Sequence, residues 1–497
     1  MHKFDKVVDR VFHKIKKIAK VEYIKGNYNE AIKAIIAGAY FMYYYAHKYS
    51  DRELEIILKN IAKKTIKVKN YEKVNKRIIF FDSLGLDNRD LTMTYIDALT
   101  KLGYNIVYVT INKNKKDYAN ISKLVKSSGG KIYTIMKKQS LQGIRELGKI
   151  INNEKPSIAF MHVTPDDVVG NAVFSAYEGK LERYMINLTD HTGWIGTSSF
   201  DYLIEFRSIG YVKSYRDRKI NKNKLLLLPF YPYDSPQKEF GGFPFDSEGK
   251  KVIYSGGQLY KLDGSDKYFE MAKHILDNYK EAIILYTGYG NNNFEMKMRT
   301  WIVGNNYQKR FYFTPERKDV DEIMKNCYFY LNTYPVGGGL MTQYAIKNKK
   351  IPITLTDYKH HMMQLVIGYD SDDRFIFDKY SEAIKEIDRL MADEEYCNKK
   401  GEMISKRVIS KSEFEKELYK LLNKHTTKYM SDIDEKDYFN YKKIASERSR
   451  NDYITLANAI GHNNSELRKY FPYIVLRRYV QKFKKWVIEK YTRRKNK

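Results

Sequence analysis

The sequence has few cysteines, no long apolar run and far fewer acidic than basic residues. Its two cysteines, Cys327 and Cys397, have neither a metal-binding spacing nor a disulfide framework, as is typical of a protein from a reducing compartment. The longest apolar run, residues 34–46, is shorter than the roughly 20 residues that a membrane span needs. The first residues, MHKFDKVVDRVFHKIKKIAK, are charged throughout and contain no signal peptide. These absences predict a soluble, intracellular protein.

The shortage of acids leaves a net charge of +29, from 89 lysines and arginines against 60 aspartates and glutamates. Residues 477–497 account for +9 of this charge, and the rest is dispersed along the chain. No helix-turn-helix, zinc knuckle or ribonucleoprotein motif accompanies the charge, so no nucleic-acid partner is expected. A general bias of the composition toward lysine is as good an explanation of the dispersed charge as a charged binding partner.

Short apolar runs that alternate with helical stretches begin near residue 76 and indicate an α/β fold. A first series contains RIIFFDSLG, NIVYVTIN, KIYTIM, SIAFMHV, YMINLTD, DYLIEF and KLLLLPF. A Pro- and Gly-containing segment, residues 234–251, separates it from KVIYSGG, AIILYTGYG, RFYFTP, YFYLNTYP, IPITLT and FIFD. Such continuous β-branched and aromatic runs are typical of strands buried on both faces of a parallel sheet.

Two series of similar size predict two Rossmann-like domains that face each other across a cleft. Residues 1–75 read as helices, either one tetratricopeptide-like hairpin or, more simply, a helical cap on the next domain. The expected divisions are an N-terminal helical region (1–75), two Rossmann-like domains (76–240 and 241–428) and a basic C-terminal helical region (429–497).

Three strand ends in the second series suit an anionic ligand. LNTYPVGGGLMTQYA (331–345) is a strand, a triple-glycine turn and the start of a helix, where close backbone approach and the helix dipole favour a phosphate. YSGGQLYKLDGS (254–265) repeats the arrangement and adds Gln258 and Lys261, which suit a diphosphate. YFTPERKDV (312–320) is the third such strand end. A tight turn without a ligand is the alternative for each loop alone, but their convergence favours a phosphate-bearing ligand.

At these residues the chain resembles a known family. GQLYKLD is similar to the Gln-Leu-Tyr-Lys-(Ile/Leu)-Asp stretch of the O-linked N-acetylglucosamine transferases and their bacterial relatives. LNTYPVGGGLMTQYA and IPIT resemble the donor loop and the following strand of GT-B glycosyltransferases. The likeness extends over about residues 76–395. It implies a GT-B hexosyltransferase that moves a sugar from a nucleotide-sugar such as a UDP-sugar to a hydroxyl of a glycan, lipid-linked or protein acceptor, in cell-envelope glycan or glycoprotein synthesis.

The resemblance also implies the donor site. Gln258 and Lys261 would face the diphosphate, and Pro315 and Arg317 would border the base. Tyr344 stands where many relatives have an acid that binds the ribose, so the ribose contact departs from the family pattern. No Asp-x-Asp motif lies in the strand-end loops, so no metal or cofactor is expected. The other implied donor-binding residues are Gly256, Gly257, Gly337, Gly338, Gly339, Leu340, Met341 and Thr342.

In the first series, NLTDHTGWIG (187–196) places Asp190 and His191 at a strand end. Transfer to a hydroxyl needs a base, and an imidazole with a near-neutral pKa suits that task. Asp190 could orient the ring, but adjacent side chains on an extended segment point apart, so Asp166 or Asp167 is the alternative. A pair that only caps a helix is the structural alternative, and His162 is expected to be structural.

Residues 467–497 predict an amphipathic helix. A basic face beside an aromatic stripe is typical of a helix lying in an anionic membrane surface, which would place the protein in the cytoplasm, peripheral on the inner membrane face. Packing of the stripe on the two-domain body is the alternative. The stripe comprises Leu476, Tyr479, Val480, Phe483, Trp486 and Val487, and the basic residues are Arg477, Arg478, Lys482, Lys484, Lys485, Lys490, Arg493 and Arg494.

A different class of protein stays open, a non-catalytic GT-B partner that binds a glycosylated chain or steadies a transferase. The change at Tyr344 would suit it, whereas a retained diphosphate site would not. A nucleotide-sugar epimerase is a third possibility, for which the sequence shows no clear paired carboxylates.

Overall fold

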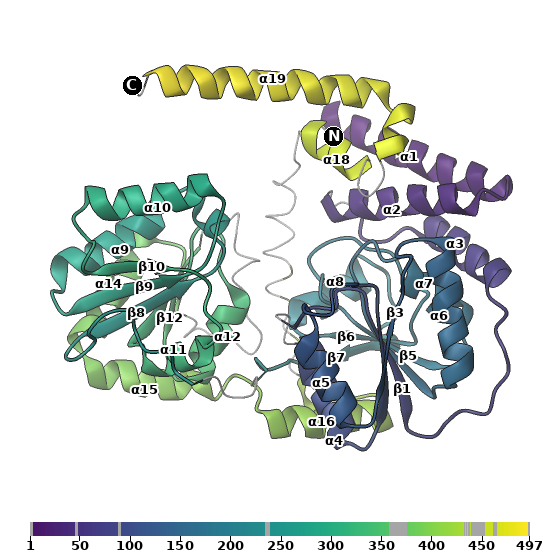
Figure 1. Ribbon diagram of the computed structural model, residues 1–497, viewed down its shortest axis with the longest axis horizontal. Coiled ribbons are helices and arrows are strands. Elements are labelled where there is room, and N and C mark those ends of the chain that lie inside the picture. Colours follow the sequence, from purple (N-terminus) through teal and green to yellow (C-terminus); the bar gives the residue numbers. More distant parts are fainter. Residues whose placement is uncertain are drawn as a thin grey trace. The chain divides into compact units, whose positions relative to one another are not determined.

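The computed structural model describes residues 3–44, 48–87, 91–233, 239–356, 375–431, 433, 435, 438, 453–460 and 465–495. The chain divides into two compact units. The first combines residues 1–228 with residues 415–497, and the second comprises residues 229–414. Each unit contains one parallel sheet flanked by helices (Figure 1), so the predicted α/β class is confirmed. Residues 234–238 of the predicted linker lie outside the described residues.

The sheet of the first unit has the order β3-β2-β1-β4-β5-β6-β7, and every pairing in it is parallel. Its central strands are buried on both faces, which explains their continuous apolar sequences. The strands are β1 (Arg77–Asp82), β2 (Asn105–Thr110), β3 (Lys131–Thr134), β4 (Ile158–His162), β5 (Glu182–Ile186), β6 (Tyr202–Glu205) and β7 (Leu225–Leu227). The helices between them are α4 (Leu91–Lys101), α5 (Ala119–Ser127), α6 (Leu141–Glu154), α7 (Val169–Ala176) and α8 (Ser208–Arg216).

Three N-terminal helices belong to the same unit and share its hydrophobic core: α1 (Lys3–Ile24), α2 (Tyr28–Tyr44) and α3 (Arg52–Thr65). Helix α2 is buried over most of its length, and α3 packs against α7. Asp51 caps α3 by accepting hydrogen bonds from the backbone N–H groups of Glu53 and Leu54. These helices therefore form a cap on the first sheet, the simpler of the two interpretations of this region.

The sheet of the second unit has the order β10-β9-β8-β11-β12-β13 and is also parallel. Its strands are β8 (Lys251–Gly256), β9 (Ala282–Thr287), β10 (Phe311–Thr314), β11 (Phe329–Leu331), β12 (Pro352–Leu355) and β13 (Ile376–Phe377). Its helices are α9 (Lys267–Asn278), α10 (Asn292–Gly304), α11 (Val320–Asn326), α12 (Gly339–Lys347), α14 (Tyr380–Ala392) and α15 (Glu394–Ser405), and α16 (Lys411–Lys424) leads back to the first unit.

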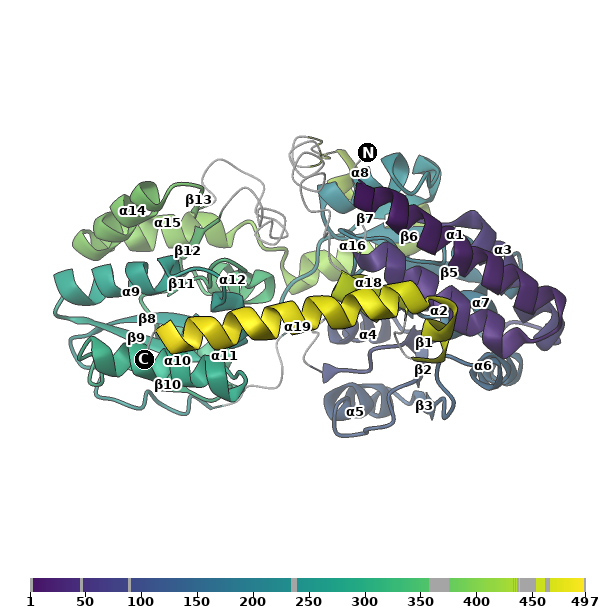
Figure 2. The same ribbon diagram turned by 90° about the horizontal axis from the view of Figure 1, so that it is seen from above.

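The C-terminal residues return to the first unit. Helix α18 (Tyr453–Ile460) packs against α2 and against α19 (Pro472–Lys495), as Figure 2 shows. Leu456, Phe471 and Ile474 belong to the same hydrophobic core as the N-terminal helices.

Both sheets reverse their strand order between the first and the fourth strand, at β1/β4 and at β8/β11. In open parallel sheets, ligands bind beyond the carboxyl ends of the strands at such reversal points. The predicted glycine loops follow β8 and β11, which flank the reversal point of the second sheet.

Candidate functional site

The loops after β8 and β11 meet in the structure. The backbone N–H of Val336 donates a hydrogen bond to the carbonyl oxygen of Lys261 (3.2 Å). The Lys261 Nζ lies 3.4 Å from the place where a Cβ on Gly338 would stand, and 3.5 Å from the corresponding place on Gly257. Gly257 also has a φ of +131°, which side chains rarely adopt. Two predicted glycine loops therefore enclose one ammonium group.

Lys261 carries an uncompensated charge. Burial lowers its pKa, and within the described ranges no carboxylate or hydrogen-bond acceptor is paired with its ammonium. Taking a charge out of water without a partner is costly, so an anion bound here would be stabilised.

Helix α12 starts beside this lysine without a capping side chain. The backbone N–H groups of Gly339, Leu340 and Met341 have no acceptor among the described residues. Such N–H groups and the positive end of the helix dipole attract anions. The lysine and the helix start thus lie together at the β8/β11 reversal point, where an anion would find both a positive charge and N–H donors.

Asn332, immediately after β11, holds the glycine loop in shape. Its Oδ1 accepts hydrogen bonds from the backbone N–H groups of Gly338 (2.8 Å) and Thr333 (2.9 Å). Its Nδ2 donates to the hydroxyls of Thr342 (3.1 Å) and Thr354 (3.0 Å). The sequence analysis missed Asn332, although a polar residue directly after a buried strand is a signal that could have found it.

Thr342 and Gly338, two of the predicted phosphate-binding residues, are hydrogen-bonded within the loop in this structure. The Thr342 hydroxyl donates to the Gly338 carbonyl oxygen (2.8 Å), and the Thr342 backbone N–H donates to the same oxygen (3.0 Å). The Gly338 N–H is bonded to Asn332. The hydrogen-bond donors of both residues are therefore engaged inside the loop. The backbone N–H groups of residues 339–341 are the ones available to an anion.

Gln258 is held by the loop after β9. Its amide donates a hydrogen bond to the hydroxyl of Tyr289, and the Leu259 N–H donates to the Tyr289 carbonyl oxygen (2.9 Å). Gly256, at the end of β8, lies close to Thr287, where a Cβ would stand 2.9 Å from the carbonyl oxygen. The loops after β8, β9 and β11 are thus joined at one edge of the sheet.

Arg317 makes structural contacts in this structure. Its guanidinium pairs with the Asp319 carboxylate (Nε to Oδ1, 2.8 Å) and donates to the Gly242 carbonyl oxygen (2.6 Å). Pro315 is exposed on the same loop. The Tyr344 hydroxyl donates to the Tyr233 carbonyl oxygen (3.4 Å), so it also contacts its own unit. Arg317 and Tyr344 therefore anchor the chain entering the second unit, a role that the sequence analysis did not foresee.

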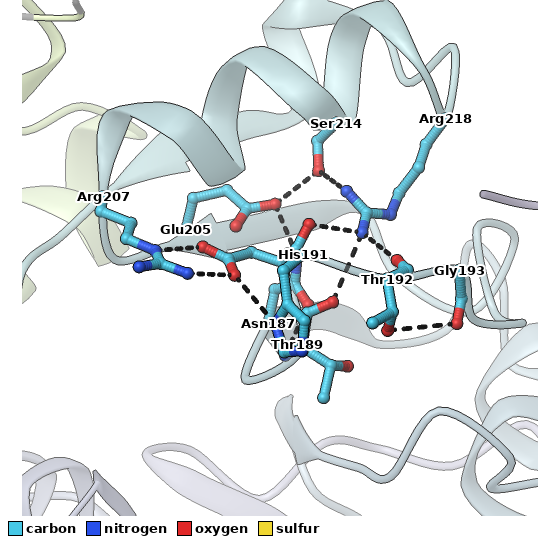
Figure 3. A network of polar contacts seen from close by, with 10 residues as sticks. Asn187, Thr189, His191, Thr192, Gly193, Glu205, Arg207, Ser214 and Arg218 are labelled. Carbon is cyan, nitrogen blue, oxygen red and sulfur yellow. Dashed lines mark hydrogen bonds and ion pairs between the residues drawn. The ribbon is translucent and has the colours of Figure 1, made fainter. Parts of the chain in front are cut away.

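In the first unit, Asp190 and His191 follow β5, and Figure 3 shows His191 among the polar residues around it. Asp190 is fully buried and pairs with the Arg207 guanidinium, with distances of 2.5 Å from Nε to Oδ2 and 2.7 Å from Nη2 to Oδ1. The His191 Nδ1 lies 3.5 Å from the Asp190 Oδ1, and the His191 side chain is 33% exposed. Burial alone would raise the pKa of Asp190, but the Arg207 guanidinium and the His191 ring outweigh it and hold the pKa far below its usual range.

A second buried arginine supports the same loop. The Arg218 Nη2 donates to the carbonyl oxygens of Asp190 (2.8 Å) and Thr192 (2.5 Å), and Nη1 donates to the Ser214 hydroxyl (3.2 Å). Ser214 in turn donates to Glu205 (2.5 Å), as Figure 3 shows. Burial raises the pKa of Glu205 to about 7. The sequence analysis missed both arginines, because nothing local in FRSIGYVKSYRDR indicates which loop they support.

The acid beside His191 is Asp190, not the alternative pair. Asp167 accepts a hydrogen bond from the Gly170 N–H (2.8 Å) at the start of α7, and burial raises its pKa to about 7. His162 is fully buried, and its Nδ1 lies 3.0 Å from the Thr92 hydroxyl, as expected for a structural histidine.

Three further features of the structure bear on the site. An open cavity of about 620 Å³ lies between α1 and α3, and none of the predicted site residues lines it. Among the described residues, no group of three or more His, Cys, Asp and Glu side chains could hold a metal ion. Within the same ranges, no helix combines the length and the apolar character that crossing a membrane requires.

Comparison with known proteins identifies the fold. No protein-family model matches the chain, and no curated protein matches its sequence significantly. A glycosyltransferase from Rickettsia africae ESF-5 shares the structure with a TM-score of 0.53 at 11% identity, over 71% of this chain and 100% of that one. Anabaena Alr3699/HepE in complex with UDP gives 0.51 at 11% identity, over 70% and 99%. A putative UDP-N-acetylglucosamine 2-epimerase from Listeria monocytogenes gives 0.50 at 9% identity, over 73% and 98%. The chain therefore has the GT-B fold with two Rossmann-like domains.

Proposed function

We propose that the protein is a glycosyltransferase that moves a sugar from a nucleotide-sugar to a hydroxyl acceptor. One observation carries the proposal. Lys261, half-buried and with no carboxylate paired to its ammonium among the described residues, lies between two glycine loops at the uncapped start of α12. A diphosphate supplies the missing negative charge and acceptors for the free N–H groups of residues 339–341.

The fold supports this choice of anion. The HepE structure with the same fold is a complex with UDP, a nucleoside diphosphate. The Listeria monocytogenes protein with this fold is named as a UDP-N-acetylglucosamine 2-epimerase, so the fold alone leaves sugar transfer and epimerisation both open. A histidine beside a buried carboxylate suits transfer, because transfer requires a base for the acceptor proton.

Each unit would contribute one part of the chemistry. In the second, Lys261 and the α12 N–H groups would stabilise the negative charge that develops on the diphosphate oxygen as its bond to the sugar breaks. In the first, the His191 Nδ1 lies beside Asp190, and the imidazole would take the proton of the acceptor hydroxyl. Arg207 would keep Asp190 ionised during that step. Gln258, through Tyr289, would position the donor.

The test is a thermal-shift series with UDP, UDP-glucose and UDP-N-acetylglucosamine, followed by chromatography of the products. A ligand at 100 times its dissociation constant should add ~2.7 kcal/mol to the free energy of unfolding. Release of UDP and free sugar without an acceptor would support transfer chemistry. Binding without any product indicates the non-catalytic partner, an epimerised nucleotide-sugar indicates the epimerase, and the absence of binding overturns the proposal.

We also propose that the acceptor belongs to a cell-envelope glycan or glycoprotein, and that the protein acts as a peripheral protein at the inner face of the membrane. The support is the basic, aromatic composition of residues 467–497. Transfer is proposed to need no metal, and excess EDTA should leave turnover unchanged.

A further inference from the structure

The first turn of helix α19 (Pro472–Lys495) packs on the core of the first unit, whereas the apolar side chains of the following turns are exposed. Ile474 is buried in the core of the first unit, and the Tyr473 ring contacts the Tyr453 ring of α18. After this turn, α19 leaves the other helices of its unit (Figures 1 and 2). Its large apolar side chains are then exposed: Leu476 by 63%, Tyr479 by 60%, Val480 by 43%, Phe483 by 64% and Trp486 by 54%.

These exposed side chains share one face of α19. Their spacing of three and four residues places them on an arc of about 120° around the helix axis. The Phe483 and Trp486 rings stack, with centroids 5.8 Å apart. Single exposed apolar residues are ordinary, but a continuous stripe marks an interaction surface. Within the first unit, packing therefore accounts only for the beginning of the helix.

The remaining faces of this segment are basic. Arg477, Lys482 and Lys484 are exposed, and no acidic residue occurs from position 472 to position 488. An ordinary solvated helix face mixes both signs of charge, because alternating pairs stabilise it. A helix with an aromatic stripe and only basic charged residues beside it complements a surface that has an apolar interior and negative charges at its boundary.

We propose that residues 476–487 lie in the surface of a bilayer that contains anionic phospholipid. The apolar stripe would sit at the boundary between headgroups and acyl chains, with Tyr479 and Trp486 at headgroup level and the cations on headgroup phosphates. The contact deepens the proposed peripheral attachment to the membrane, on which it rests, but it does not depend on the proposed sugar transfer, so loss of vesicle binding and loss of transfer are distinguishable. Only its consequence rests on the proposed transfer: α19 would hold the His191 loop near acceptors in the same membrane.

Sedimentation of the full chain with vesicles tests the contact. Binding to phosphatidylcholine vesicles with phosphatidylglycerol should exceed binding to phosphatidylcholine alone and should fall as salt is added. Phe483→Ser with Trp486→Ser should weaken binding by at least about tenfold. Lys482→Gln with Lys484→Gln should weaken it about 25-fold at low salt.

A matched control exists on α10 of the second unit, where Met296 and Val303 are 62% and 57% exposed. Met296→Ser with Val303→Ser should leave binding unchanged. Trp486 also serves as a fluorescent reporter of binding in every variant that keeps this residue. Trp194 is buried and Trp301 packs against a core, so a blue shift of emission on vesicle addition reports Trp486.

Four outcomes would overturn the proposal: no vesicle binding, equal binding to neutral vesicles, unchanged binding of the Phe483/Trp486 variant, or equal loss in the control. Trp486 emission that is already blue-shifted without vesicles would also overturn it. Analytical ultracentrifugation would then assign the stripe to a dimer interface if the mass is doubled.

Discussion

The predicted donor loops of the second unit and the His191 loop of the first balance their charges in opposite ways. The Asp190 carboxylate is matched by Arg207, and Arg218 is matched by Glu205 and by carbonyl oxygens of the loop. Lys261 has no such match within the described residues. The His191 loop thus has its main charges paired within the protein, whereas the donor loops lack a negative charge beside Lys261.

This difference teaches what each loop has to do. A base must be held in one orientation before the acceptor arrives, so its supporting charges are paired within the protein. A diphosphate site must bind its ligand with a favourable free energy, and a positive charge that has no partner in the protein contributes to that free energy. The following changes would break or sharpen the contrast.

The largest effect is expected from His191→Ala, which removes the proposed base. Turnover should fall by roughly 10²–10⁴-fold, with donor affinity nearly unchanged, as measured by initial rates and calorimetry. Thr189→Ala in the same loop is the control, because the loop contacts of Thr189 are made by its backbone. Unchanged turnover of the histidine variant would reduce His191 to a structural residue.

The next effect concerns the matched charges. Arg207→Leu leaves the buried Asp190 carboxylate without its partner and should lower the free energy of unfolding by about 3–5 kcal/mol, measured by urea denaturation. Adding Asp190→Asn should recover part of this loss, because the buried charge is then removed as well. A single variant as stable as the wild type would show that the pair does not support the loop.

Lys261→Met should separate binding from stability. Hydrogen bonds to charged groups contribute ~1.5–3 kcal/mol, so UDP affinity should fall about 10- to 150-fold by calorimetry. The ligand-free variant should be as stable as the wild type or more stable, since an uncompensated charge is lost. Lys267→Met, at an exposed lysine of α9, should change neither quantity. Wild-type affinity in the Lys261 variant would remove the lysine from the donor site.

The smallest effect is a pH dependence. Because the folded pKa of Glu205 is raised to about 7, the folded state binds the proton more tightly than the unfolded state, and its stability falls as pH rises from about 5 to 7. Glu205→Gln should remove on the order of 1–3 kcal/mol of this fall while keeping the acceptor for Ser214 and Asn187. Equal pH profiles by thermal denaturation would contradict the raised pKa.

Much of the fold could be predicted because its strands are buried on both faces. RIIFFDSLG forms β1 and AIILYTGYG forms β9, since short continuous apolar runs are typical of the buried strands of a parallel sheet. The meeting of the two glycine loops could also be predicted, because loops after neighbouring parallel strands share one edge.

Side-chain partners could not be predicted in the same way. Arg207 and Arg218 lie 17 and 28 residues beyond Asp190, and only the packing of α8 beside the loop brings them together. The Thr342 hydroxyl was expected to face a phosphate, but a threonine in the first turn of a helix can also bond back to the preceding turn, as it does here. Sequence patterns predict which elements meet more reliably than which atoms do.

The first unit is discontinuous along the chain, since residues 229–414 are inserted within it. Its late segment completes its sheet edge: the Thr427 hydroxyl bonds to the Leu227 carbonyl oxygen, and the His425 and Tyr202 rings stack 4.2 Å apart. At about 5–20 residues per second, the ribosome needs roughly 10–40 s to make the insertion. During translation, β7 therefore lacks its neighbours from residues 425–427 until the whole second unit has been synthesised. The first unit begins to form first and is completed last.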